Sequence, residues 1–288
     1  MGNEKQAILA VVGPTAVGKS ALALRLAERL GGEILSCDSM QVYRGMDIGT
    51  AKPTKDEMAE IPHHLIDIAD PEKDTYNLSE FCRDAFRAID DIRKRGKLPL
   101  LCGGTALYLD ALLKGYRLPG GKLPEREKGI ARSVADPGAE PSFTPPFELD
   151  ALVIGVLFDR KVVRDRIEKR LDARFACGMA DEVKRLHEEQ GVSYEKLEFF
   201  GLEYREIACF LQGKCTFEEM RQSLLDKIRQ FAKRQDIFFR KIERSGQDIF
   251  WCCEGKEPDP AELVRKFLAG ETLPEITFRL ADVDYGKK

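Results

Sequence analysis

The feature that most constrains the fold is an octapeptide near the start of the chain, which has the form G-x-x-x-x-G-K-S. Its residues are Gly13, Pro14, Thr15, Ala16, Val17, Gly18, Lys19 and Ser20. The apolar residues 7–12 before it have the composition of a buried strand, and residues 21–30 after it alternate Leu and Ala at helical spacing. A strand, a glycine-rich loop and a helix in this order are typical of a loop that binds a phosphate group.

The residue types of this phosphate loop, residues 13–20, explain why such a loop binds phosphate. Glycine lets the backbone curl, so that consecutive N–H groups and the N-terminus of the following helix point at one anion. Lys19 adds a mobile positive charge and Ser20 adds a hydroxyl group suited to Mg²⁺, so all of residues 13–20 are candidate contacts. The commonest cargo of such a loop is a nucleoside triphosphate such as ATP. Alone, the octapeptide therefore also permits a small-molecule kinase or a nucleotide-binding module.

Composition narrows the class of protein. The chain has 288 residues, 43% of them hydrophobic, and a net charge of −3, which gives no overall attraction to nucleic acid. No apolar run approaches the length of about 20 residues that spans a bilayer. The eight cysteines contain no C-x-x-C pair, so we expect reduced thiols rather than structural zinc. These features predict a cytoplasmic protein that does not bind a membrane.

The order of segments predicts an α/β fold. Up to residue 118, strand-like and helix-like segments alternate, which favours a P-loop NTPase-like, mostly parallel sheet flanked by helices. Residues 119–149 are rich in proline and predict a short surface excursion within one domain over 1–288. After them the chain is mainly helical. The expected strands are 33–36, 98–102 and 151–158, and the expected helices are 81–95, 106–114, 160–176, 179–190, 203–211 and 216–244.

Two further loops should open on the same crevice as the phosphate loop. In a parallel sheet the loops after the strands line the ligand site, which places Asp38 beside residues 13–20. There its carboxylate can accept a proton or anchor Mg²⁺ through water, although an Asp in this position also suits a turn. The length and polarity of residues 38–53 favour function. Gly103-Gly104-Thr105 follows another strand, and Thr105 can contact a ligand or cap a helix.

The strongest charge pattern lies between residues 221 and 244, where eight Lys and Arg residues outnumber three acidic ones. Helical spacing puts Arg229, Lys233, Arg240 and Arg244 in one stripe, opposite an apolar face. A solvated helix face normally mixes the two signs of charge. A stripe of one sign instead favours contact with the phosphates of a nucleic acid.

Together these segments resemble the tRNA dimethylallyltransferase family, also called tRNA isopentenyltransferase. The resemblance rests on residues 13–20, 38–53, 103–108 and 231–240, and 201–206 is similar to a shorter family motif. It covers most of residues 7–118 and 152–251. The family transfers the dimethylallyl group from dimethylallyl diphosphate to the exocyclic amine of the adenine next to the tRNA anticodon, and it uses Mg²⁺. The resemblance therefore implies an enzyme whose partners are the anticodon stem-loop and the diphosphate donor, and we expect it to be a monomer.

The same resemblance implies roles for individual residues. Asp38 would be the general base, residues 13–20 would hold the diphosphate with Ser20 nearest the metal, and Arg205 would help to neutralise the leaving group. The implied catalytic residues are Asp38, Lys19, Thr105 and Arg205. The implied tRNA contacts are Asp38, Ser39, Met40, Gln41, Thr105, Arg229, Lys233, Arg234 and Arg240.

One departure from the family leaves the acceptor open. The family usually carries a helical insertion that grips the anticodon stem, and this chain has the short, proline-rich residues 119–149 in its place. Smaller departures are Phe238, where the family often has Trp, and Ile237, where Thr is usual. A prenyltransferase that acts on free AMP, ADP or ATP is therefore an alternative. A kinase is less favoured, because the strand at 98–102 ends in Gly-Gly and not in the Asp that a kinase would use.

Overall fold

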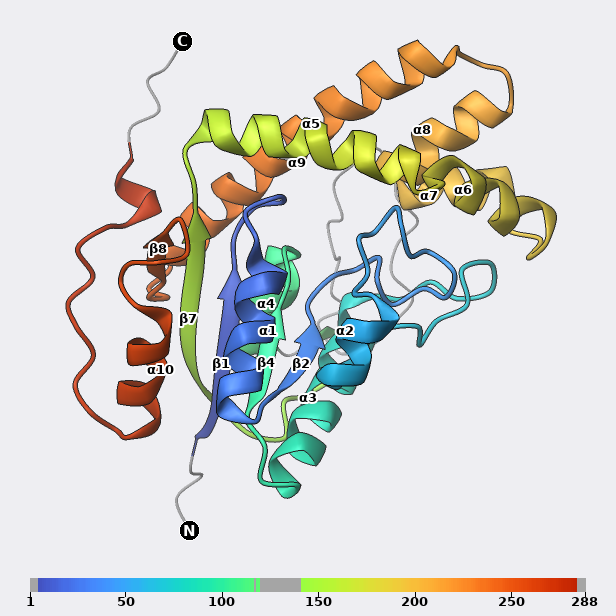
Figure 1. Cartoon of the computed structure of the whole chain (residues 1–288). Coiled ribbons are helices and arrows are strands. Elements are labelled where there is room, and N and C mark those ends of the chain that lie inside the picture. The colour runs from blue at the N-terminus through green and yellow to red at the C-terminus, as the bar shows by residue number, and fades with distance from the viewer. Residues whose placement is uncertain (1–4, 117, 120–140, 284–288) are drawn as a thin grey trace.

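The computed structural model describes residues 5–116, 118–119 and 141–283, and its centre is a parallel β-sheet (Figure 1). In this part of the chain six strands pair in the order β3-β2-β4-β1-β7-β8, and every pairing between them is parallel. The strands are β1 Gln6–Val12, β2 Glu33–Ser36, β3 His63–His64, β4 Pro99–Cys102, β7 Leu149–Leu157 and β8 Phe250–Cys253. The predicted α/β fold with a parallel sheet is confirmed.

The sheet is buried on both faces because helices cover both. Successive residues of a strand point to opposite faces, so Leu9 and Val11 belong to one hydrophobic cluster and Ile8 and Ala10 to the other. The helices around the sheet are α1 Lys19–Leu30, α2 Lys55–Glu60, α3 Leu78–Lys94, α4 Ala106–Leu113 and α10 Pro260–Leu268, and a 3₁₀ turn covers Leu280–Asp282. Helix α1 supplies the first cluster, and α3 and α4 supply the second.

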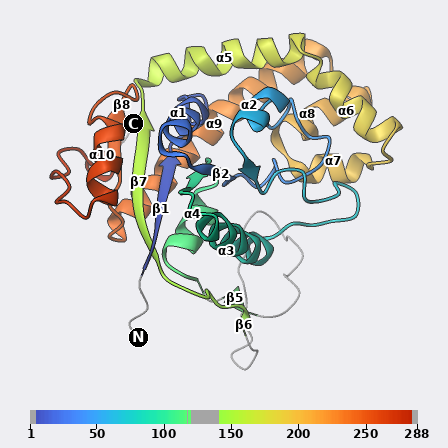
Figure 2. The same cartoon turned by 60° about the horizontal axis from the view of Figure 1, so that its bottom comes forward.

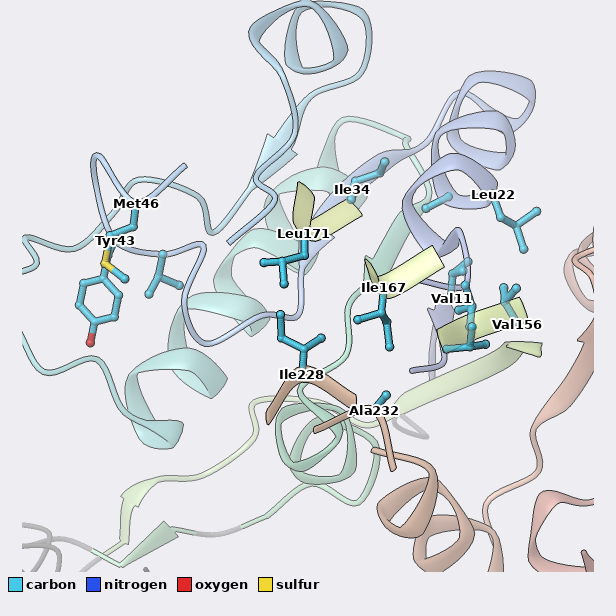
Figure 3. Packing of buried hydrophobic residues seen from close by; sticks show 14 of the residues in the cluster. Val11, Leu22, Ile34, Tyr43, Met46, Val156, Ile167, Leu171, Ile228 and Ala232 are labelled. Atoms are coloured by element: carbon cyan, nitrogen blue, oxygen red, sulfur yellow. The ribbon is translucent and has the colours of Figure 1, made fainter. Parts of the chain in front are cut away.

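The second half of the chain is helical, as expected, and it covers one end of the sheet. Its helices are α5 Arg160–Ala176, α6 Met179–Glu188, α7 Tyr194–Phe200, α8 Leu202–Leu211 and α9 Phe217–Arg244. Figures 1 and 2 show α5 and α9 crossing above the end of the sheet at which β1 and β2 stop. Ile167 and Leu171 of α5 are buried in the same cluster as Ile228 of α9 (Figure 3). This packing places two long helices directly over the loops that follow the strands.

Most predicted elements differ from the observed ones by only a few residues at their ends. The helix expected at 81–95 begins at Leu78, because Asn77 accepts hydrogen bonds from the N–H groups of Ser79 and Glu80 and so caps it. Among the described residues, the elements that sequence reasoning did not predict are α2, β3, β5 (Leu118–Pro119), β6 (Pro141–Phe143), α7, β8, α10 and the 3₁₀ turn. They are short, and β8 is held at the sheet edge by its pairing with β7. Two-residue β3 and four-residue β8 carry too little periodicity to be recognised locally, whereas α10, with nine residues, is amphipathic and was overlooked.

The predicted excursion at 119–149 lies largely outside the described residues. Its two described ends pair with each other, because β5 Leu118–Pro119 runs antiparallel to β6 Pro141–Phe143. Within the described part of the chain, no helix is both long enough and apolar enough to cross a membrane.

Candidate active site

A cavity of about 330 Å³ lies where the loops after β1, β2 and β4 meet beneath α5 and α9. These are the three loops that the parallel-sheet argument brings to one crevice. The lining includes Thr15, Lys19, Ser20, Asp38, Ser39, Met40, Gln41, Gly104, Thr105, Arg170, Arg174 and Gln235. The remaining residues of the phosphate loop, Gly13, Pro14, Ala16, Val17 and Gly18, are not among the lining residues. The structure thus brings basic, acidic, amide and hydroxyl side chains from distant parts of the chain to the wall of one cavity.

The phosphate loop is held by hydrogen bonds. Lys19 Nζ donates to the carbonyl oxygen of Pro14 at 2.6 Å, and the N–H of Thr15 donates to Gln235 Oε1 at 2.8 Å. Arg170 donates to the hydroxyl oxygen of Thr15. Burial lowers the pKa of Lys19 to about 8, with the nearby Arg170 guanidinium adding to the effect. A partly buried cation whose hydrogen bond runs to a neutral carbonyl oxygen is suited to an incoming anion.

Asp38 lies in the loop after β2 and lines the cavity. Its Oδ1 accepts the N–H of Met40 at 2.9 Å. Burial raises the pKa of Asp38, whereas the N–H groups of Met40 and Gln41 and the charge of Lys19 act in the opposite direction. The hydroxyl of Thr105 accepts the N–H of Ser39 at 3.1 Å, which joins the third loop to this one. A carboxylate with a raised pKa is the stronger base, so this burial favours proton abstraction.

Two arginines from α5 enter the cavity, and sequence reasoning missed both. Arg170 and Arg174 line it, and burial together with the charge of Arg174 lowers the pKa of Arg170 to about 10. Arg174 Nη1 donates to Glu203 Oε1 at 3.0 Å and to the carbonyl of Gly49 at 3.3 Å. The spacing of these two arginines could have predicted that they face inward. Arg170 and Arg174 follow the buried Ile167 at i+3 and i+7, on the face of the helix that turns inward.

Arg205 is placed differently from what the resemblance implies. Its side chain is exposed, and its Nε donates to the carbonyl oxygen of Glu198 at 2.8 Å. It is not among the cavity-lining residues, although Gly201, Glu203 and Tyr204 are. The reason is local, because α8 begins at Leu202 and turns Arg205 toward α7. The cations that the structure brings to the cavity are instead Lys19, Arg170 and Arg174.

The predicted basic stripe on α9 does not form one continuous charged surface. Arg229 Nη2 pairs with Glu168 of α5 at 3.0 Å, and Arg240 Nη2 donates to the carbonyl oxygen of Val283 at 2.6 Å. The acidic partner of Arg229 comes from another helix, which the charge pattern of α9 alone cannot show, and contact of the stripe with a nucleic acid stays a prediction. Lys233 and Arg234 are exposed, and neither forms an ion pair with an acidic residue in the described ranges.

Gln235 is the clearest functional candidate that the sequence alone did not identify. It is buried on α9, and its Nε2 donates to the carbonyl oxygen of Gly104 at 2.9 Å while its Oε1 accepts from Thr15. A Cβ on residue 104 would lie 2.3 Å from Gln235 Nε2, so only glycine allows this approach. A polar residue on the buried side of an amphipathic helix was the available signal.

The cavity offers oxygen ligands that suit Mg²⁺. Mg²⁺ prefers oxygen donors, and it takes one or two of them from protein and the rest from water and substrate phosphates. The Ser20 hydroxyl and the Asp38 carboxylate both line the cavity and meet this requirement. In the described ranges no three His, Cys, Asp or Glu residues are grouped to hold a metal, so a site made wholly of protein ligands is not indicated there. His63 lines the cavity edge, with its Nδ1 2.7 Å from the carbonyl oxygen of Ile61.

Comparisons with known proteins agree on one family. The IPP transferase model matches residues 41–142 and 132–242, and an isopentenyl transferase model matches residues 6–69. A tRNA dimethylallyltransferase 1 of Geotalea uraniireducens is 41% identical, over 93% of this chain and 98% of that protein. The crystal structure of the full-length tRNA isopentenylpyrophosphate transferase from Bacillus halodurans is 33% identical with a TM-score of 0.74, over 92% of this chain and 96% of that one.

A second solved structure gives the same result. The tRNA isopentenylpyrophosphate transferase of Staphylococcus epidermidis is 30% identical with a TM-score of 0.72, over 92% of this chain and 98% of that one. The two family models together span residues 6–242, so they include every segment that lines the cavity. The chain therefore belongs to the IPP transferase family of tRNA dimethylallyltransferases.

Proposed function

We propose that the protein transfers a dimethylallyl group from dimethylallyl diphosphate to the exocyclic amine of the adenine next to the anticodon of tRNA. The observation that carries the proposal is that Asp38 shares one cavity with the cations Lys19, Arg170 and Arg174. When an amine displaces diphosphate, a base must take the proton of the amine and positive groups must stabilise the leaving diphosphate. The cavity offers candidates for both tasks. Membership of the family supports the same reaction.

In this reaction the donor diphosphate binds at residues 13–20, and Lys19, Arg170 and Arg174 surround its negative charge. The adenine amine forms a bond to the allylic carbon, and the carbon–oxygen bond to the diphosphate breaks with its electron pair passing to oxygen. The cations stabilise the charge that develops on that oxygen. Asp38 accepts the proton that the amine loses. Bound Mg²⁺, held by Ser20, would add further neutralisation of the diphosphate.

The acceptor adenine reaches such a cavity only when it leaves the base stack of the anticodon loop. Residues 38–41 and Thr105 lie on the cavity wall and are the proposed contacts of the extruded base. Lys233 and Arg234 are the proposed contacts of the RNA backbone, since both are exposed cations on α9. The part assigned to Arg205 stays a prediction, because its guanidinium would have to leave the carbonyl oxygen of Glu198 to reach the leaving group.

The decisive experiment offers the purified protein two acceptors. With dimethylallyl diphosphate and Mg²⁺, we expect unmodified tRNA to gain the mass of one prenyl group and AMP to remain unchanged. Product on AMP alone would establish the free-nucleotide alternative, which the short residues 119–149 suggest. Consumption of ATP without any prenyl product would identify a kinase instead.

The Asp38→Asn variant tests the assigned base. The amide keeps an oxygen for the N–H of Met40 but cannot take a proton at neutral pH, so we expect turnover to fall by about 10²–10⁴-fold. The affinity for inorganic pyrophosphate should change little. Near-normal turnover would remove Asp38 from this role.

We also expect the protein to be a monomer and to act in the cytoplasm. Size-exclusion chromatography at several protein concentrations tests whether it is a monomer.

A further inference from the structure

Glu182 of α6 is a buried carboxylate that binds the backbone of a distant loop. Its Oε2 accepts the N–H groups of Asp47 at 2.9 Å and Ile48 at 2.6 Å, and its Oε1 accepts the N–H of Gly49 at 3.0 Å. The hydroxyl of Tyr204 donates to the same Oε1 at 2.9 Å. Only 3% of Glu182 is exposed. A carboxylate this deeply buried is costly unless such donors satisfy it, so these four bonds account for its presence.

Neutral groups, not a cation, hold the charge of Glu182. Among the described residues, no Lys, Arg or His forms an ion pair with it, so backbone N–H groups and one phenol stabilise the carboxylate. Burial and the carboxylate of Glu182 raise the pKa of Tyr204 well above its usual value, which keeps its hydroxyl proton in place to donate. The arrangement therefore fixes three consecutive residues of the loop at once.

The residues that Glu182 holds continue into the cavity wall. Gly49, Thr50 and Ala51 all line the cavity. The carbonyl oxygens of Thr50 and Ala51 accept hydrogen bonds from Gln41 Nε2 at 3.3 and 3.1 Å. The other end of that amide, Gln41 Oε1, accepts the hydroxyl of Ser36 at 2.7 Å. Glu182 is thereby linked, through residues 47–51, to the Asp38–Gln41 segment.

The phosphate loop has a separate set of supports. Its hydrogen bonds run to Gln235, to Arg170 and within the loop itself, and none of them includes Glu182. A change at Glu182 therefore leaves the hydrogen bonds of the phosphate loop in place. Arg174 donates to the carbonyl of Gly49 at 3.3 Å, so the phosphate loop, and not Arg174, is the part of the donor site that is independent of Glu182.

We propose that Glu182 is a positioning residue that holds residues 47–51 in the conformation that receives the acceptor adenine, so that it sets the affinity for acceptor and not for donor. This inference rests on the proposed function. It assigns the role to a residue that lies outside the cavity and acts through the backbone.

The test uses Glu182→Gln in the full-length protein. The amide group cannot accept hydrogen bonds at its nitrogen, so at least one pair of the present bonds is lost. We expect KM for unmodified tRNA to rise about tenfold, with a smaller change in kcat. KM for dimethylallyl diphosphate and the Kd of inorganic pyrophosphate should stay within about twofold of the wild-type values. Glu188→Gln is the matched control, because Glu188 is an exposed residue of the same helix whose ion pair with Lys184 spans 3.9 Å.

A second variant reaches the same segment without altering the carboxylate. A Cβ on Gly49 would lie 2.7 Å from the Tyr204 hydroxyl oxygen, so in Gly49→Ala either the loop or the Tyr204 ring must shift, which disturbs the contacts that both make with Glu182. We expect the same selective rise in KM for tRNA, and this variant decides the question if Glu182→Gln does not fold. An unchanged KM for tRNA, or an equal rise in KM for both substrates, would show that Glu182 serves only stability.

Amide hydrogen exchange separates this inference from the proposed function. If the wild-type protein makes no prenylated tRNA, the proposed function has failed, whereas exchange at residues 47–49 still reports whether Glu182 holds them. We expect Glu182→Gln to accelerate exchange at those of the three N–H groups that lose their acceptor oxygen, either Asp47 and Ile48 or Gly49, and to leave β1 unchanged. Unchanged exchange at residues 47–49 would overturn the inference, whichever acceptor the wild-type enzyme uses.

Discussion

Gln235 accepts a hydrogen bond from the backbone N–H of Thr15 at 2.8 Å, although 220 residues separate the two in the chain. The same side chain donates to Gly104, so one buried amide on α9 joins the phosphate loop to the loop after β4. Lys233 and Arg234 precede it on the exposed side of the helix. Helix α9, which is proposed to contact RNA, is therefore hydrogen-bonded to the phosphate loop, which is proposed to bind the donor.

Replacing Gln235 with Leu should weaken both stability and donor binding. The N–H of Thr15 and the carbonyl of Gly104 would lose their partner while remaining partly buried, which costs about 2 kcal/mol in the free energy of unfolding. Urea denaturation measures this loss, and calorimetry with inorganic pyrophosphate measures the accompanying drop in affinity. Gln230→Leu, at an exposed position of the same helix, should leave both quantities unchanged. An equal loss in the two variants would contradict the assigned bonds.

Lys19 should make donor binding depend on pH near neutrality. Its pKa of about 8 means that the free protein loses this positive charge as the pH rises through 8. Because a diphosphate binds better to the protonated form, affinity for pyrophosphate should be full below about pH 7 and decline above about pH 8. In Lys19→Arg the charge persists, so the decline should be smaller. Since the protonation of pyrophosphate itself is the same in both titrations, the difference between the variants isolates Lys19, and identical pH profiles would refute the prediction.

Arg170 should contribute directly to donor affinity. It lines the cavity and donates to the Thr15 hydroxyl of the phosphate loop, so Arg170→Gln removes a positive charge from the proposed diphosphate site. We expect at least about a tenfold increase in the Kd of pyrophosphate, the usual effect of losing one charged hydrogen bond. Lys169→Gln removes the same charge from the adjacent, exposed position of α5 and should have little effect. Similar losses in both variants would indicate a general electrostatic effect.

The salt dependence of RNA binding should distinguish the two kinds of cation on α9. Neutralising Lys233 or Arg234 should reduce the slope of log K against log salt by about 1 for each phosphate that the variant no longer binds. Arg229→Gln serves as the comparison, because Arg229 is already paired with Glu168 at 3.0 Å and should alter the slope less. Filter binding of unmodified tRNA at several salt concentrations measures these slopes. If Arg229 gave the larger change, a continuous basic stripe would be the better description of this helix.

Much of the fold follows from local sequence patterns. The phosphate loop, the Asp38 loop and Gly103-Gly104-Thr105 each come after an apolar strand, and parallel strands bring all three to one edge of the sheet. The long helices were also predictable, because their apolar residues recur at helical spacing. Short elements such as β8 were not predictable, since their stability comes from pairing with β7.

The sequence by itself therefore determined the type of fold, the phosphate loop and the position of the Asp38 base candidate. Only the tertiary structure decided which cations face the cavity, because the direction of each side chain depends on how the helices pack and on the partners that neighbouring elements supply. Arg229 is neutralised by Glu168 of another helix, and Arg205 is drawn to the carbonyl oxygen of Glu198, whereas Arg170 is turned inward. Glu182 and Gln235 carry no local signal of their contacts, since a hydrogen bond across 133 or 220 residues exists only once the chain has folded.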